Sequence, residues 1–178
     1  GDSAIEFLDH KREAGVKVRV LTNSLASHDV PAVNSHYEPW RDDFLNAGVD
    51  LWELRADPAI QHTVVDVPPV SAKFTGLHSK CAVADRRFVF IGSMNLDPRS
   101  RAINTEMGVM VDSPELAEDL ARMLERNMSG ANAWHVQMNA EGKLSWENGD
   151  ETVTKQPARD GMQRVMNVLM KLGPRDQY

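Results

Sequence analysis

The stretch Leu77–Asp85, which reads LHSKCAVAD, decides the local fold and carries most of the chemistry. We predict a strand over 77–84, followed by a second strand over 87–91. Only Asp85 and Arg86 separate the two strands, so the pair is expected to form a tight hairpin. Because successive side chains of a strand point to opposite faces, His78 and Lys80 are expected to share one face.

A neutral imidazole beside an ammonium group suits phosphate chemistry. The imidazole of His78 can attack phosphorus or carry a proton. The ammonium of Lys80 can neutralise the non-bridging oxygens while negative charge builds on them. The pair therefore favours a phosphate group as the reacting group.

A second motif, Gly92–Asn95 (GSMN), follows the hairpin. Gly92 is expected to let the chain turn tightly after its strand. The side chains of Ser93 and Asn95 can both donate hydrogen bonds to a phosphate oxygen. Glu106 lies in the next predicted strand, 105–111, and a carboxylate of this kind can bind one imidazole nitrogen and leave the other free to react.

The charge distribution agrees with a local anionic ligand. The chain has 178 residues and a net charge of −6, which argues against a general nucleic-acid binder. The segment 71–103 is nevertheless positive, with two acidic residues, Asp85 and Asp97, against Lys73, Lys80, Arg86, Arg87, Arg99 and Arg101. A positive island in an acidic chain favours one bound anion over a long polyanion.

These motifs resemble a known family. The pattern H-x-K-x4-D followed by G-S-x-N is the signature of the phospholipase D superfamily, the HKD proteins, and it covers residues 76–106 here. Three flanking segments are similar to the bacterial cardiolipin synthase-like branch: TNSL at 22–25, FLNAGVDLWEL at 44–54 and NLDPRS at 95–100. The resemblance implies a phospholipase D-like α/β domain with a mixed central sheet flanked by helices.

The resemblance also implies a mechanism. One histidine attacks phosphorus to form a phosphohistidine, a second protonates the leaving alcohol, and water or another alcohol then attacks, without a metal or organic cofactor. Carried over to this chain, His78 is the nucleophile or the general acid, with the acid role favoured. Lys80, Asn95 and Ser93 would bind phosphate, and Glu106 would orient His78. Asp85 is the signature aspartate and would support the site structurally.

The chain departs from the family in carrying a single copy of the motif, whereas the family's active site uses two. None of the other histidines opens a second H-x-K-x4-D pattern; they are His10, His28, His36, His62 and His135. We expect the C-terminal half of a larger lipid phosphatidyltransferase, with a phospholipid substrate and a second HKD domain in the same parent chain. The alternative is a homodimeric phosphodiesterase or nuclease with one motif per chain. A bacterial protein in the cytoplasm, peripheral to the inner membrane, is expected, and nucleic acid is not an expected partner.

The rest of the chain has the order of an α/β domain. We predict helices over 4–13, 36–47, 113–128 and 159–172, strands over 16–21 and 49–54, and two or three short strands within 134–154. The strand–helix–strand order 16–54 predicts a parallel pair with a right-handed crossover. Residues 57–75 are predicted as a loop. We expect a catalytic domain over 1–130, and an extension over 131–178 packed on it.

Several residues have two readings. Thr22–Ser24 would line the pocket or form a turn at a strand end, and Arg99 and Arg101 would contact a second phosphate or lie in solvent. Cys81, the single cysteine, rules out an internal disulfide and is predicted as a small core residue. The last helix carries an apolar face that we expect to pack in the core or at a domain interface, with membrane contact as the alternative; its members are Met162, Val165, Met166, Leu169 and Met170.

Overall fold

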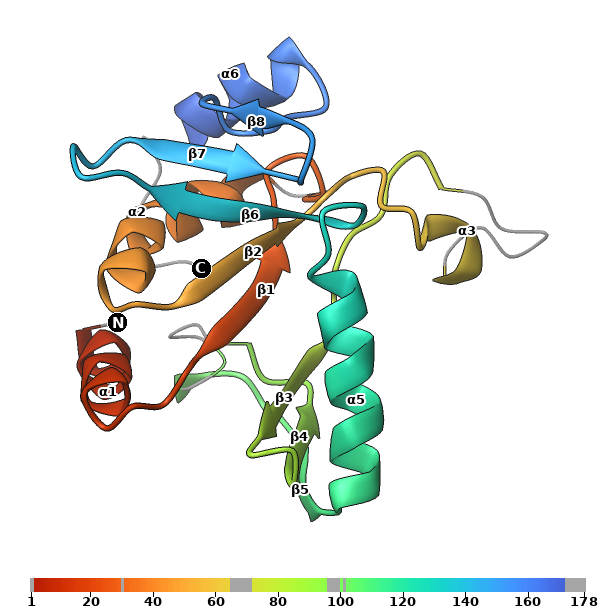
Figure 1. Ribbon diagram of the computed structural model, residues 1–178. Helices are drawn as coiled ribbons and strands as arrows, with labels where there is room; N and C mark the ends of the chain where they lie inside the picture. Colours follow the sequence, from red (N-terminus) through yellow and green to blue (C-terminus); the bar gives the residue numbers. More distant parts are fainter. Residues whose placement is uncertain (1, 30, 65–71, 96–99, 101, 172–178) are drawn as a thin grey trace. The chain divides into compact units, whose positions relative to one another are not determined.

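The computed structural model describes residues 2–29, 31–64, 72–95, 100 and 102–171. These residues form two compact units. The larger unit consists of residues 2–77 together with 127–171, and the smaller consists of residues 78–126. The predicted α/β class is confirmed, with helices and strands following one another along the chain (Figure 1).

The larger unit is built on a mixed five-stranded sheet in the order β1-β2-β6-β7-β8. Its strands are β1 Arg19–Asn23, β2 Asp50–Leu54, β6 Ala133–Met138, β7 Leu144–Glu147 and β8 Thr152–Val153. The pair β1 and β2 is parallel, as predicted, and the remaining pairs are antiparallel. Because β6 pairs with β2, residues after 130 extend the sheet that the N-terminal strands begin; the proposed domain boundary at residue 130 remains a prediction.

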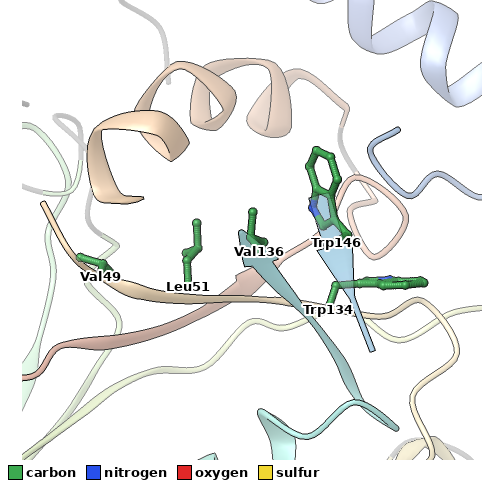
Figure 2. Packing of buried hydrophobic residues seen from close by; sticks show 5 residues of the cluster. All are labelled: Val49, Leu51, Trp134, Val136 and Trp146. Carbon is green, nitrogen blue, oxygen red and sulfur yellow. The ribbon is translucent and has the colours of Figure 1, made fainter. Parts of the chain in front are cut away.

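Helix α2, Pro31–Asn46, makes the crossover between β1 and β2. Gly48 follows it with φ +75, a left-handed conformation that glycine adopts without strain and that ends the helix before β2. The core lies on one face of the sheet, where Leu51, Val136 and Trp146 stand side by side from three neighbouring strands (Figure 2). Helix α1, Asp2–Glu13, contributes Leu8 to this cluster.

A charged network is buried on the same side of the sheet. The Glu53 side chain is fully buried, and its carboxylate accepts hydrogen bonds from Arg41 Nε at 2.8 Å, Tyr37 Oη at 3.1 Å and Trp146 Nε1 at 2.8 Å. Burial, together with the Glu53 charge, raises the pKa of Tyr37. Since all three donors converge on one carboxylate, they join α2, β2 and β7.

Helix α6, Gly161–Met170, packs with polar side chains against helix α2 and the loop after β1. Asp160 caps its first turn by accepting from Gln163 N at 2.7 Å. Gln163 and Asn167 are buried, whereas Met162 and Leu169 are 69% and 53% exposed, as is Val165 at 54%. The prediction that this apolar face packs in the core is therefore wrong, because the hydrogen bonds of Gln163 and Asn167 turn the opposite face inward. Packing at a domain interface and contact with a membrane stay predictions.

The smaller unit is an antiparallel sheet in the order β3-β4-β5, beside helix α5 (Figure 1). Its elements are β3 Lys80–Ala84, β4 Phe88–Gly92, β5 Gly108–Asp112 and α5 Pro114–Asn127. The predicted hairpin is confirmed: Asp85 and Arg86 form its turn with φ 53 and 49. The Ser113 hydroxyl accepts from Leu116 N at 3.2 Å, which confirms the predicted helix start.

Element limits differ from the predictions at a few ends. The strand predicted from 77 begins at Lys80, and the one predicted from 105 begins at Gly108. The predicted loop 57–75 contains a short helix, α3 Gln61–Val64. Among the described helices, none is long and apolar enough to cross a bilayer.

Candidate functional site

Strand register brings three separate sequence segments to one end of the β3-β4-β5 sheet. Lys80, the first residue of β3, pairs with Gly92, the last residue of β4. Gly92 in turn pairs with Gly108, the first residue of β5. The H-x-K segment, the G-S-x-N segment and the segment before β5 therefore meet at the same sheet end.

The two glycines allow this close meeting. A Cβ on Gly92 would lie 2.7 Å from the Met107 carbonyl oxygen and 2.9 Å from the Phe90 ring. A Cβ on Gly108 would lie 2.5 Å from the same ring. Gly92 is the last residue of β4, and the space left by its missing side chain is occupied by the Met107 carbonyl oxygen and the Phe90 ring.

Glu106 is the centre of a hydrogen-bond cluster at this end. Its carboxylate accepts from Ser93 Oγ at 2.5 Å, Ser100 Oγ at 3.0 Å and Asn104 Nδ2 at 3.3 Å. The Ser93 hydroxyl also accepts from Met107 N at 3.1 Å, which ties β4 to the segment before β5. The hydrogen bonds from Ser93 and Ser100 lower the pKa of Glu106, and the nearby Lys80 ammonium acts in the same direction.

Lys80 lies near this cluster, and its ammonium contacts the backbone of His78. Lys80 Nζ donates to the His78 carbonyl oxygen at 2.8 Å, and its charge is close enough to lower the pKa of Glu106. The His78 side chain is exposed and precedes β3 by two residues. An exposed imidazole two residues from an ammonium that lies near a hydrogen-bonded carboxylate is a candidate for acid–base or nucleophilic chemistry on an anion.

Asp85 lies apart from these residues. It occupies the β3–β4 turn, whereas Lys80 lies at the opposite end of β3. At about 3.3 Å per residue, five residues of strand separate the two by roughly 16 Å. The structure therefore places Asp85 in the hairpin turn, at the end of the sheet opposite Glu106.

Comparison with known proteins identifies the family of this chain. Residues 2–128 match the family described as "Cardiolipin synthase, PLD-like domain". The chain belongs to this phospholipase D-like family. It is 35% identical over 164 residues to cardiolipin synthase C of Escherichia coli, a match that covers 90% of this chain and 34% of the relative.

Two further relatives of this PLD-like domain are uncharacterized proteins from two strains of Helicobacter pylori, each 28% identical over 156 residues. These matches cover 86% of this chain and 29% of each relative. The chain thus spans about a third of the length of the curated relatives that it matches. No solved structure matches it.

Within the PLD-like domain, the structure brings together Lys80, Ser93 and Glu106. His78 lies two residues before Lys80 in the chain. Asn95 is exposed three residues beyond Gly92. Arg99 and Arg101 lie outside the described residues. A metal cluster of three or more His, Cys, Asp or Glu residues is absent from the described part of the chain.

Sequence reasoning missed Ser100 as a member of the site. Ser100 is 4% exposed and donates to Glu106, a contact that its place in the NLDPRS segment did not reveal. The only available signal was its position six residues before Glu106 in the same motif-rich segment. Cys81 is half-buried, and burial raises the pKa of its thiol, which disfavours the thiolate form that a nucleophile would need.

Proposed function

We propose that this chain supplies one catalytic half of a phospholipid phosphatidyltransferase that works through a phosphohistidine. The observation that carries the proposal is the meeting of Lys80, Ser93 and Glu106 at one sheet end inside a PLD-like domain. The name of its Escherichia coli relative, cardiolipin synthase C, supports a phospholipid as the substrate.

The reaction proceeds in two displacements. An imidazole nitrogen of one histidine attacks phosphorus, and the bond from phosphorus to the leaving alcohol breaks. The second histidine gives that alcohol its proton. An acceptor alcohol then loses its proton to the second histidine and attacks phosphorus, and the phosphorus–nitrogen bond breaks. We assign His78 to the acid–base role and the attacking imidazole to the second HKD domain.

The other residues stabilise charge and geometry. Lys80 and Asn95 bind the non-bridging oxygens, where the Lys80 ammonium offsets the growing negative charge. Glu106 orients the His78 imidazole. Ser93 already donates its hydroxyl proton to Glu106 and would exchange that bond to donate to a phosphate oxygen. Asp85 supports the hairpin that carries Lys80.

A second HKD domain completes the site, because this chain contains a single H-x-K-x4-D pattern. In the proposed enzyme that domain belongs to the same parent chain, and the protein meets its phospholipid at the surface of the bacterial inner membrane from the cytoplasmic side. The single motif also favours one alternative, a homodimeric phosphodiesterase in which two copies of this chain build one site.

The test uses the complete gene product with vesicles that contain phosphatidylglycerol, and it measures cardiolipin formed and phosphatidic acid released. His78→Ala is expected to lower turnover by about 10³-fold or more, as loss of a catalytic histidine does. The matched control His10→Ala changes an exposed histidine of α1 and is expected to leave turnover unchanged. Normal turnover in His78→Ala would refute the proposal. Hydrolysis of a soluble phosphodiester that rises steeply with the concentration of this chain alone would favour the homodimer.

A further inference from the structure

The chain just before His78 is held by a side chain from a distant segment. Asn23 ends β1, and its Nδ2 donates to the Leu77 carbonyl oxygen at 2.8 Å. Its Oδ1 accepts from the Leu77 backbone N–H at 2.7 Å. One side-chain amide thus pairs with both backbone groups of Leu77, as a neighbouring strand would.

This contact reaches His78 through covalent geometry. The Leu77 carbonyl belongs to the planar peptide group that also contains the His78 nitrogen and Cα. When Asn23 holds that carbonyl, it holds the whole peptide plane. Only the φ and χ angles of His78 then remain to set where its imidazole points.

The two residues before Leu77 also lie against other segments of the larger unit. Thr75 is buried, and its N–H donates to the Ala56 carbonyl oxygen at 2.8 Å. Gly76 lies so close to the Ser27 carbonyl oxygen that a Cβ there would be 3.1 Å from it. The hydrogen bonds of Thr75 and of Asn23 therefore hold the chain on both sides of Gly76, immediately before His78.

Asn23 itself is locked in one orientation. The Ser27 hydroxyl donates to Asn23 Oδ1 at 3.0 Å, so that atom receives two donors and the opposite amide orientation would place N–H groups against them. The loop that carries Ser27 is held in turn by Gln163 of α6, whose Nε2 donates to the Leu25 carbonyl oxygen at 2.7 Å.

We propose that Asn23 is a positioning residue for His78, acting through the Leu77–His78 peptide group. The inference rests on the proposed function, since it matters for turnover only if His78 takes part in the reaction. Asn23 does not touch the substrate in this role. Its loss changes how often the imidazole occupies its reactive position, so it lowers kcat and leaves KM nearly unchanged.

The test is Asn23→Asp in the complete gene product. Aspartate has the same shape, but its carboxylate cannot donate to the Leu77 carbonyl oxygen and repels it. We expect kcat to fall roughly 10- to 100-fold with KM within about twofold, because small displacements of a reacting group cost rates of that order. The matched control is Asn132→Asp, a buried asparagine of the same unit that accepts from Ile60 N at 3.0 Å and donates to Ser129 Oγ at 3.1 Å. It is expected to lose a similar amount of stability and to retain kcat.

A milder variant protects the test against misfolding. Ser27→Ala keeps both bonds between Asn23 and Leu77 and removes one of the two donors that orient the amide. We expect kcat to fall a few-fold. An unchanged kcat in folded Asn23→Asp would overturn the positioning role, and so would equal losses of kcat in Asn23→Asp and Asn132→Asp. If Asn23→Asp does not fold, an unchanged kcat in Ser27→Ala would overturn it. If His78→Ala is active, the proposed function itself fails. If His78→Ala is inactive while the Asn23 and Ser27 variants are fully active, only the positioning role fails.

Discussion

The Ser93 hydroxyl donates to the Glu106 carboxylate at 2.5 Å and accepts from the backbone N–H of Met107 at 3.1 Å. The serine of the G-S-x-N motif and the glutamate of the next segment are therefore one hydrogen-bonded unit. A residue that sequence reasoning assigns to phosphate binding also supports the carboxylate that is proposed to orient the histidine.

This pairing predicts that Ser93 and Glu106 act together. We expect Glu106→Gln and Ser93→Ala each to lower kcat about 10-fold or more, and the double variant to lose little beyond the larger single loss, since residues in one network are not additive. Kinetics of the four proteins measure the coupling. Asp112→Asn is the control, because Asp112 is a hydrogen-bonded carboxylate of the same unit outside the cluster. Fully additive losses for Ser93→Ala and Glu106→Gln would contradict a shared role.

Gly92→Ala is expected to push β5 away from the end of β4. The added methyl group would meet the Met107 carbonyl oxygen and the Phe90 ring inside contact distance, and overpacking of this kind costs about 1–3 kcal/mol. Urea denaturation measures that loss, and the activity of the folded fraction should fall with it. The control is Gly161→Ala, where a Cβ would meet nothing within 4 Å. Equal stability in the two variants would mean that Gly92 is not needed for the close approach.

Asp85 is expected to matter through its backbone. With φ at 53, it adopts a left-handed conformation that asparagine tolerates and valine does not. Asp85→Asn should keep most activity, whereas Asp85→Val should lower the free energy of unfolding by about 1–2 kcal/mol. Chemical denaturation and turnover of both variants separate the roles. A large loss of turnover in stable Asp85→Asn would instead assign the carboxylate a part in the reaction.

The buried pair Arg41–Glu53 is expected to dominate the stability of the larger unit. Glu53→Gln leaves the Arg41 charge, 4% exposed at its side chain, without its carboxylate. Removing one partner of such a pair costs about 3–5 kcal/mol. Asp57→Asn removes the 78% exposed partner of Arg55 and should cost no more than about 1 kcal/mol. Thermal and urea unfolding compare the two, and similar small losses would show that water relaxes around Arg41.

His28 predicts a dependence of stability on pH. Burial lowers its pKa below the ordinary 6.5, with smaller opposing and reinforcing effects of Asp29 and Arg159. In the unfolded chain the His28 imidazole therefore takes up a proton near pH 6.5, whereas in the folded chain it stays neutral until the pH is lower. The contribution of the neutral, buried His28 to the free energy of unfolding is fully present above pH 6.5, and it is lost as the pH falls through the lower pKa of the folded state.

His28→Gln should accordingly lose less stability between about pH 7.5 and about pH 5.5 than the parent chain does. Urea midpoints at the two pH values measure the difference. His10→Gln, at an exposed position of α1, serves as the control and should behave like the parent chain. If His28→Gln and the parent lost the same stability over that range, His28 would not be responsible for any part of it.

The local features of this protein follow from its sequence because they depend on neighbouring residues. Strand order at 77–91, the two-residue turn at Asp85-Arg86 and the Ser113 cap all involve residues a few positions apart, and each is confirmed. The spacing of His78, Lys80, Ser93 and Asn95 likewise identified the phospholipase D-like family that residues 2–128 match.

Contacts between distant segments could be identified only from the tertiary structure. The pairing of β6 with β2, the bond from Ser100 to Glu106, the inward polar face of α6 and the hold of Asn23 on Leu77 join residues from six to more than a hundred positions apart. No local pattern encodes these contacts. Strand register and the choice of the buried face depend on the whole chain, because the folded state must pair its polar groups and bury its apolar surface at the same time. The sequence by itself thus determined the family to which this chain belongs, because that depends on a short motif, whereas the packing decided which distant residues surround the motif.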